Sequence, residues 1–424
     1  MAWLSRTTCS LLCHSNPDLT ITHVDGDTIS GGYVVFETMR KTDPDFALFQ
    51  GDMIYADNAI PATKEIPADV GGGIWVNNPP KDFVAISVDE FRANWKYNFG
   101  DEKMQAFLAQ TPVYVQWDDH EVTNNAWPGE LIGEPLYPSN TSVDELYVNS
   151  LQALYEFNPL MANDPLFRSH RVNKHLEIFF VDYRSFRGPN PDTSNPDGSP
   201  MMGEEQLQWL KDSLSASNAT WKVVSSHDPL GLVTGGPGDY DAFAQDDPAV
   251  LGRELELQDV LGHIKTESIE NVVFLTSDVH FTAAVKYDPS RATFQDFDVF
   301  YEFVIGPVHA GAFGPQILDA SFGPEYEYVR APGTEGLGIN LPPPNLQSFG
   351  HAMVSEDGSV MTVKLIDVTG EVLFEKVMEA STTDGENPAP TPAPVPTPGP
   401  ATTSGAVLAS IWMTALTTAA SLAL

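Results

Sequence analysis

Residues 113–121 of this 424-residue chain read Val-Tyr-Val-Gln-Trp-Asp-Asp-His-Glu, an apolar run that ends abruptly in three acids and a histidine. A short run rich in Val and aromatic residues predicts a buried β-strand. Acids packed this closely after a strand repel one another unless cations or basic partners compensate them. The stretch therefore indicates a strand that carries metal-binding side chains to the edge of a sheet. A solvated acidic loop is the alternative.

Three further apolar runs end in the same way. They are residues 46–50 before Asp52, residues 221–224 before His227, and residues 272–276 before Asp278 and His280. Ligand sites in α/β sheets lie just beyond the C-terminal ends of the strands, so we expect the four ends to converge. Their carboxylate and imidazole groups suit hard and borderline cations. The sequence thus predicts an α/β fold with a hydrolytic site for two or more metal ions.

The first two motifs supply the central candidates. Asp52 follows a glycine that permits a sharp turn, and its carboxylate is expected to bridge two cations, although Gly-Asp alone is a common turn. Tyr55 would add a phenolate, a ligand that favours Fe³⁺. Asp119 suits a metal ligand. His120, one residue further, is predicted to act outside the ligand shell as a general acid for the leaving oxygen.

The remaining candidates depend on the strand-end pattern. A lone His227 would normally be a surface or core residue, but its position after a strand favours metal binding. Asp278 and His280 alternate, so on an extended backbone they would face the same side and reach one metal cluster. Two asparagines and a histidine complete the set: Asn124 and Asn125 would position phosphate or complete a coordination shell, and His309 would line the pocket or be structural.

The charge of the chain excludes one class of partner. There are 58 acidic residues and 22 basic ones, for a formal net charge of −36. Nucleic-acid binding needs basic patches, so we exclude it. Adaptation to salt or solubility is the simpler explanation of the charge, and attraction of divalent cations is the alternative. Cys9 and Cys13 are the only cysteines, so no disulfide framework staples the core.

The C-terminal region has a different composition from the rest. Residues 384–402 are rich in Pro, Thr and Ala, small residues follow at 403–406, and an uncharged tail runs over 407–424. A Pro-rich segment forms an extended stalk rather than a packed core. Small residues before an apolar tail indicate a GPI-attachment signal, and a transmembrane tail anchor is the alternative. We therefore expect an extracellular or cell-surface protein that touches membrane only through this tail.

The sequence predicts four regions. They are an N-terminal segment (1–30) that we expect to be incomplete, a compact domain (31–380), a stalk (381–404) and a hydrophobic tail (405–424). Within the domain, periodicity predicts helices near 33–40 and 203–214, a long loop over 56–80, and a closing meander of strands near 353–354, 360–366 and 372–377. Asn140 and Asn218 lie in sequons that permit glycosylation of a secreted chain.

The motifs resemble those of a known family. The segments are Gly51-Asp52-x-x-Tyr55, residues 117–125, Gly203-Glu204-Glu205-Gln206 with Trp209-Leu210, and Asp278-Val279-His280. Together they are similar to the alkaline phosphatase D (PhoD-like) family of metallo-dependent phosphatases, from about residue 31 to 350. The resemblance implies an α/β fold, a four-layer αββα sandwich, in a secreted protein. It also implies an active site that holds Fe³⁺ and Ca²⁺ or another pair of cations and that hydrolyses phosphomonoesters and phosphodiesters.

Two departures from the family pattern stand out. The family supplies an early Cys or Asp ligand on its first strand, and here the candidates are Cys9, Cys13, Asp18, Asp25 and Asp27, none in a clear motif. This departure supports the expectation that upstream sequence encodes a signal and a further strand. His227 stands where an acid or amide is usual, and it resembles the Val-x-x-His of purple acid phosphatases.

The sequence as a whole predicts a membrane-tethered, metal-dependent phosphoric ester hydrolase that acts on small phosphate esters. A phosphodiesterase specialised for polymeric or glycerophosphodiester substrates is one alternative. A catalytically inactive cell-surface binding protein is the other. No motif specifies the physiological leaving group or the oligomeric state.

Overall fold

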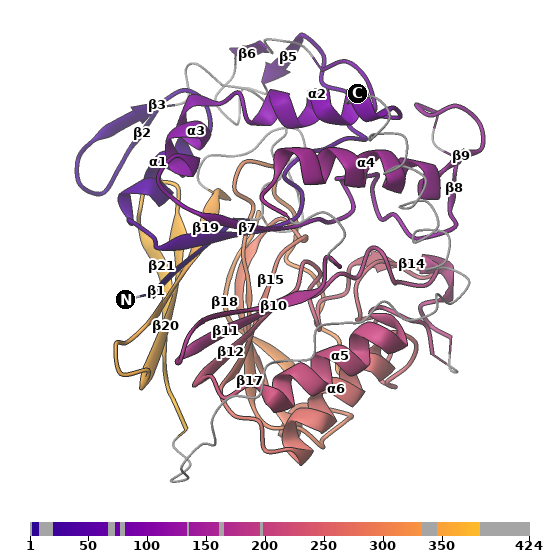
Figure 1. Ribbon diagram of the computed structural model, residues 1–424, viewed down its shortest axis with the longest axis vertical. Helices are drawn as coiled ribbons and strands as arrows, with labels where there is room; N and C mark the ends of the chain where they lie inside the picture. The colour runs from indigo at the N-terminus through magenta and orange to yellow at the C-terminus, as the bar shows by residue number, and fades with distance from the viewer. Residues whose placement is uncertain are drawn as a thin grey trace, which may run out of the picture.

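Two large β-sheets form the centre of the molecule (Figure 1). The computed structural model describes residues 2–7, 20–66, 73–76, 81–133, 135–160, 165–195, 198–332 and 346–381. The six-stranded sheet has the order β21 (Val372–Glu379), β20 (Val360–Asp367), β19 (Ser348–Val354), β1 (Ala2–Thr7), β4 (Phe46–Gln50), β7 (Val113–Gln116). The seven-stranded sheet has the order β10 (Arg168–Asn173), β11 (Leu176–Phe180), β12 (Trp221–Ser225), β15 (Val272–Thr276), β17 (Phe300–Val304), β16 (Thr282–Tyr287), β18 (Pro324–Arg330).

Each sheet has a parallel core. Strands β1, β4 and β7 are parallel in the first sheet, and β11, β12, β15 and β17 are parallel in the second. Parallel strands are covered on both faces and therefore read as continuous apolar runs, which is why β4, β11 and β12 are buried at every position. Their C-terminal ends lie at one edge of each sheet, where ligand sites form.

Helices cover each sheet on one side. Helices α1 (Val34–Lys41), α2 (Val88–Asn98), α3 (Glu102–Leu108) and α4 (Val143–Phe157) share an apolar cluster with β4 and β7, whereas α5 (Gly203–Ala216) and α6 (Glu254–Thr266) pack on the second sheet (Figure 1). A third cluster contains Leu48, Val223 and Val363 and joins strands of both sheets. The predicted mixed α/β class is confirmed, and the regular four-layer order stays a prediction.

The predicted elements compare closely with the structure. All four motif strands form, α5 begins at Gly203 as expected, and the closing meander is β19–β20–β21 at an outer edge. The loop predicted over 56–80 is an exception, because it contains the hairpin β5 (Thr63–Ile66) and β6 (Gly73–Val76). The first residues also contribute more than expected, since β1 lies between β19 and β4 in the first sheet.

Smaller elements complete the fold. They are the hairpins β2 (Thr20–Thr22)/β3 (Thr28–Ser30), β8 (Leu131–Ile132)/β9 (Thr141–Ser142) and β13 (Gly235–Gly236)/β14 (Asp239–Tyr240), with short 3₁₀ turns at Asn190–Asp192 and Pro289–Arg291. The predicted tail and nearly all of the stalk, residues 382–424, lie outside the described residues, as do Cys9, Cys13 and Asp18. Within the described part of the chain, every helix is too short or too polar to cross a bilayer.

Candidate metal centre

The candidate centre lies where loops from both sheets meet. Two glutamines at strand ends hold the sheets together beneath it. Gln50 Nε2 donates to the carbonyl oxygens of Ser226 and Leu275, both at 2.8 Å. Gln116 Nε2 donates to Val181 O at 2.8 Å and to Ser225 O at 3.0 Å. Because these buried amides bond main-chain atoms of the other sheet, they fix the position of one set of loops against the other.

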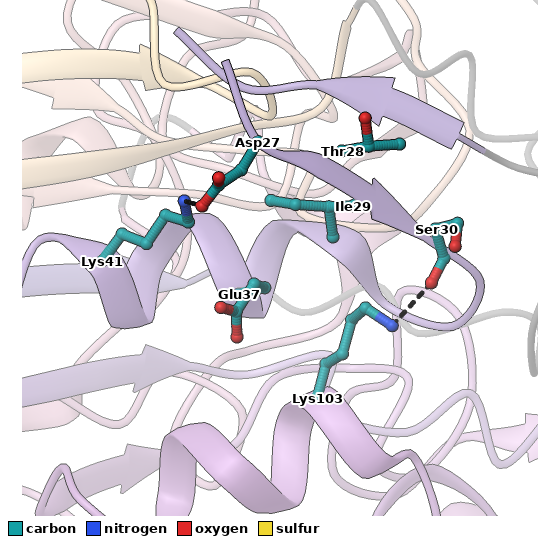
Figure 2. A pocket seen from close by; sticks show the side chains of 7 residues that line it. All are labelled: Asp27, Thr28, Ile29, Ser30, Glu37, Lys41 and Lys103. Carbon is teal, nitrogen blue, oxygen red and sulfur yellow. Dashed lines mark hydrogen bonds and ion pairs between the residues drawn. The ribbon is translucent and has the colours of Figure 1, made fainter. Parts of the chain in front are cut away.

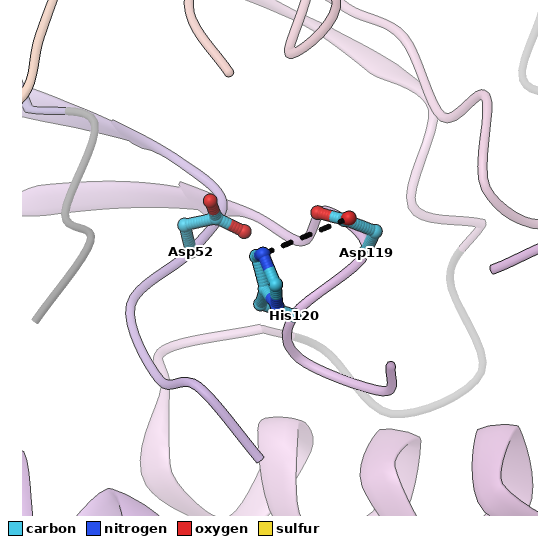
Figure 3. A group of neighbouring side chains, drawn as sticks. All are labelled: Asp52, Asp119 and His120. Carbon is cyan, nitrogen blue, oxygen red and sulfur yellow. Dashed lines mark ion pairs between the residues drawn. The ribbon is translucent and has the colours of Figure 1, made fainter. Parts of the chain in front are cut away.

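Acidic side chains and histidines crowd this junction. Among the residues that the structure describes, four groups have potential ligand atoms within 4.8 Å of one another: Asp52/Asp119/His120, Asp118/His227/Asp228, Asp118/Asp119/Asp278 and Asp228/Asp241/Asp278. Figure 3 shows the first group, with the Asp52 and Asp119 carboxylates on either side of the His120 ring. The structure therefore brings predicted residues from β4, β7 and β15 into one place.

Several buried carboxylate oxygens in these groups lack ordinary partners. Asp52 Oδ1, Asp118 Oδ2 and Asp119 Oδ1 have no hydrogen-bond partner among the described residues. A buried charge without a partner is costly. Burial, followed by repulsion from neighbouring carboxylates, raises the pKa values of Asp52 and Asp278 well above their usual range. A bound cation would relieve both effects, so the residues present fit a metal centre.

Two arginines supply only part of the compensating charge. The fully buried Arg184 pairs with Asp118 at 2.6 Å and with Asp241 at 2.8 Å. Arg187 pairs with Asp228 at 2.7 Å and with Asp241 at 2.6 Å. The groups above contain six aspartates and face these two arginines, so an excess of four negative charges remains when every carboxylate is ionised and the histidines are neutral.

Arg184 also sets the charge state of Asp118. Burial alone would raise the pKa of Asp118, but Arg184 and His227 together hold it below its usual range. The Asp118 carboxylate is therefore ionised, and Arg184 and His227 stabilise its negative charge.

His280 and Tyr55 have the geometry of a ligand pair. His280 Nδ1 lies 2.8 Å from Gly311 O, so this nitrogen carries the proton and donates it, and Nε2 is the acceptor nitrogen of the neutral ring. Nε2 and Asp52 Oδ2 lie 2.9 Å and 3.1 Å from the Tyr55 hydroxyl oxygen, so the two acceptors compete for its single proton. Burial lowers the pKa of His280 to about 3, so the ring is neutral. A backbone partner for the distal nitrogen is typical of metal-binding histidines.

The extended backbone predicted for Asp278 and His280 is wrong, and their binding to one metal cluster stays a prediction. Both residues have positive φ, 72° and 55°, so this segment turns and is not extended. Asp278 accordingly groups with Asp118 and Asp119, while His280 faces Tyr55.

His227 is fully buried and reaches the acidic groups through Nδ1, which lies 3.0 Å from Asp118 Oδ1 and 3.2 Å from Asp228 Oδ2. Its other nitrogen, Nε2, accepts the main-chain N–H of Tyr183 at 3.0 Å. The ring proton is therefore on Nδ1, which faces both aspartates at ion-pair distance without the alignment of a hydrogen bond. To bind a metal ion, the ring would have to give up either the Nδ1 proton or the hydrogen bond from Tyr183. The role of His227 as a metal ligand therefore stays a prediction.

His120 has a partner that the sequence analysis did not identify. Its Nδ1 lies 2.9 Å from both carboxylate oxygens of Asp57, and its ring stacks on Tyr55 with centroids 3.9 Å apart. Nε2 is 3.9 Å from Asp119 Oδ2, the contact drawn in Figure 3. Burial would lower the pKa of His120, but Asp119 and Asp57 raise it to about 9. His120 is thus poised to hold a proton beside the acidic groups.

The asparagines contribute main-chain groups. Asn124 N donates to Asp57 Oδ2 at 2.8 Å, and Asn125 N donates to Asp119 Oδ2 at 2.7 Å. His309 is fully buried, its ring packs edge-on against Tyr33 at 4.6 Å, and it belongs to none of the candidate metal groups of the described residues. Substrate contact by these three side chains stays a prediction.

Two of the candidates for the early ligand lie elsewhere. Asp25 and Asp27 both pair with Lys41, and their side chains are 47% and 70% exposed. Lys41, Asp27 and Lys103 border a hollow of about 360 Å³ between β3, α1 and α3 (Figure 2). Lys103 donates to Ser30 O at 2.7 Å. None of the residues that line this hollow belongs to the candidate metal groups of the described chain.

Several residues of the centre had no predicted role: Asp57, Asp118, Glu121, Arg184, Arg187, Asp228 and Asp241. Some had a detectable signal. Arg184 follows the apolar run of β11, as the other motifs follow their strands, and Asp228 directly follows His227. Asp57 lies two residues beyond Tyr55, just outside the Gly51-Asp52-x-x-Tyr55 motif. Asp241 had no such signal, because it follows a two-residue strand.

Together, the fold and the geometry define a mixed α/β protein with a candidate metal centre at converging strand ends. The model of the PhoD-like phosphatases matches residues 16–364, and the chain therefore belongs to that family. The sequence is 26% identical over 270 residues to alkaline phosphatase D of Bacillus subtilis (strain 168), a match that covers 59% of this chain and 43% of that protein. The chain thus spans less than half of that relative's length.

A solved structure of PhoD superposes with a TM-score of 0.60 at 18% sequence identity, over 91% of this chain and 72% of the other. This likeness shows a shared fold. The family is metal-dependent, which agrees with the acidic and histidine groups described above.

Proposed function

We propose that this protein is a metal-dependent phosphoric ester hydrolase that cleaves phosphomonoesters and phosphodiesters. The observation that carries the proposal is the set of buried aspartate oxygens without hydrogen-bond partners at the junction of the two sheets, counted over the described residues. Membership of the PhoD-like phosphatases supports the same reaction class. Small phosphate esters are the proposed substrates.

The donor atoms divide into two kinds, which supports Fe³⁺ and Ca²⁺ as the cations. Tyr55, His280 and Asp52 offer a phenol, an imidazole and a carboxylate, and the phenol lies within hydrogen-bonding distance of the other two groups. This mixed set suits a transition metal. Asp118, Asp119 and Asp278 offer only carboxylate oxygens, the ligand type of Ca²⁺. Other divalent cations are expected to compete for the second set.

The residues of the chain would divide the work. When bound, such cations polarise a phosphoryl group and activate water for in-line attack. Asp52 belongs to the group that also contains Asp119 and lies 3.1 Å from the Tyr55 hydroxyl, so its carboxylate would help to hold the cations of both sets. His120 would protonate the leaving oxygen. Asp57 accepts the Nδ1–H of His120 and so directs Nε2 toward the centre.

The proposal is tested by metal analysis and turnover on the same preparation. The full chain should contain two or more cations and hydrolyse nitrophenyl phosphate and its diester, and Asp52→Asn should abolish both properties. Asp89→Asn changes an exposed aspartate that pairs with Arg92 on α2 and serves as the matched control. Metal without turnover would favour the inactive binding protein, and turnover of diesters alone would favour the specialised phosphodiesterase. Protein with neither property would refute the proposal.

We further propose that the protein is attached to the cell surface through a GPI anchor. The small residues and apolar tail after residue 402 support this location. Asn140 is exposed, as an acceptor for glycosylation must be, whereas Asn218 is partly buried and accepts a hydrogen bond from Arg171. Phosphatidylinositol-specific phospholipase should release the protein from cells. Retention after treatment would indicate a transmembrane anchor instead.

A further inference from the structure

Glu121 connects the two loops that carry the central aspartates. Its side chain is fully buried, and its two oxygens accept four main-chain N–H groups. Oε1 accepts from Met53 at 2.6 Å and from Ile54 at 3.2 Å. Oε2 accepts from Asp52 at 2.8 Å and from Asp118 at 2.7 Å. One carboxylate therefore joins the loop after β4 to the loop after β7.

The loop after β4 needs this support. Asp52 has φ of +53°, a left-handed conformation that is unfavourable for a residue with a side chain. The preceding Gly51 has φ of +90°, and a Cβ there would lie 2.3 Å from Asp118 Cβ. The two loops thus approach too closely for any side chain at residue 51. Successive N–H groups in such a turn form a concave site for an anion, and here the Glu121 carboxylate fills it.

These hydrogen bonds fix the direction in which the Asp52 side chain points. Since the N–H groups of Asp52, Met53 and Ile54 are all held by Glu121, the backbone of residues 52–54 is fixed relative to Asp118. This leaves the Asp52 carboxylate near Asp119 and His120 (Figure 3). Phosphate cannot use the same N–H groups, because they are already occupied by a carboxylate of the protein.

We propose that Glu121 is a positioning residue of the metal centre, a buried side chain whose two oxygens hold the Asp52 and Asp118 loops at the separation that cations require. This inference rests on the proposed function. Glu121 acts through the main chain of its neighbours, since its oxygens are directed at N–H groups. Residues that orient metal ligands typically contribute 10–100-fold to metal affinity.

The test compares two glutamates with the same chemistry. Glu121→Gln keeps the size of the side chain but turns one acceptor oxygen into an NH₂ that faces two N–H donors. Glu256→Gln is the matched control, because Glu256 also accepts three successive main-chain N–H groups, from Met201 at 3.0 Å, Met202 at 2.6 Å and Gly203 at 3.2 Å. Glu256 belongs to none of the candidate metal groups of the described residues.

Calorimetric titration of metal-free protein with Ca²⁺ supplies the readout, and thermal unfolding of the same samples reports stability. We expect Glu121→Gln to weaken Ca²⁺ binding roughly 10–100-fold, and Glu256→Gln to lower the unfolding temperature while Ca²⁺ affinity stays at the wild-type value. If Glu121→Gln does not fold, Glu121→Asp, which keeps the charge on a shorter side chain, should show the same loss of affinity.

Wild-type affinity in a folded Glu121 variant would overturn the inference, as would an equal loss of affinity in both glutamine variants. A wild-type protein that binds no metal at all would instead refute the proposed function and, with it, this inference. The two failures are therefore distinguishable.

Discussion

Replacing His120 by alanine tests the assignment of the general acid. In the structure, Asp57 holds Nδ1 at 2.9 Å, so the second ring nitrogen, Nε2, is directed at the acidic groups. Asp119 and Asp57 raise the pKa of the ring to about 9, although burial opposes them. The ring therefore carries a transferable proton at neutral pH in this arrangement.

The expected loss follows from that role. General acid catalysis contributes about 10²–10⁴-fold in rate, which corresponds to roughly 3–5 kcal/mol of transition-state stabilisation. His120→Ala should lower kcat by this factor for an alkyl phosphate, whose leaving oxygen needs a proton. The loss should be much smaller for nitrophenyl phosphate, because nitrophenolate leaves without protonation. Asp57→Asn should reduce kcat for the alkyl phosphate, since an amide does not stabilise the charged ring as a carboxylate does.

The assay is steady-state kinetics on the two substrates, with metal content measured on the same protein. His263→Ala is a suitable control, because His263 lies on α6 and its ring faces Ser215 on the surface. Bound metal should be unchanged in the His120 variant. Loss of metal, or equal slowing of both substrates, would refute the reasoning, because His120 would then be a ligand or a phosphate-binding group.

Three other perturbations have defined outcomes. Asp52→Ala should remove bound metal and activity together, which elemental analysis and phosphate release will measure; a variant that keeps full metal content would contradict the bridging role. Arg184→Leu should lower the free energy of unfolding of the metal-free protein by about 3–5 kcal/mol, because it leaves buried carboxylates unpaired; denaturant unfolding that shows less than about 1 kcal/mol would disprove this. Burial, then Lys364, lowers the pKa of His351 from 6.5 to about 4. The unfolded chain therefore binds this proton first, so the stability from neutral His351 is present above pH 6.5 and is lost as the pH falls toward 4, by up to about 1.4 kcal/mol per pH unit. The stability of His351→Gln should accordingly fall less than that of wild type between pH 7 and pH 5, and parallel urea-unfolding curves would argue against this titration.

The sequence predicted the strands better than the contacts between them. Residues 46–50 and 272–276 are strands with the expected bounds, because buried parallel strands are continuous apolar runs. The residues that follow them were found for the same reason. By contrast, the Asp57–His120 and Arg184–Asp118 pairs join residues 63 and 66 positions apart, and nothing in local periodicity encodes such a pairing.

Backbone geometry at the site was the second feature that could not be predicted from the sequence. Alternating residues face the same side of a sheet only as long as the backbone stays extended. At Asp278 and His280 the φ angles become positive, so the rule failed at the point where the site begins. Main-chain roles were equally hidden, since Asn124 and Asn125 are seen to act through their N–H groups.

The division of the centre between two sheets has a consequence for assembly. Asp52, Asp118 and Asp119 come from the loops of the first sheet, whereas Asp228, Asp278 and His280 come from the second. Each sheet therefore carries an incomplete set of donors. A cation held by the loops of both sheets would act as a reversible cross-link, and all of its ligands would be in place only after the two sheets have packed together in the correct register. Correctly folded molecules would then bind their cations, and molecules in which the two sheets have packed incorrectly would not.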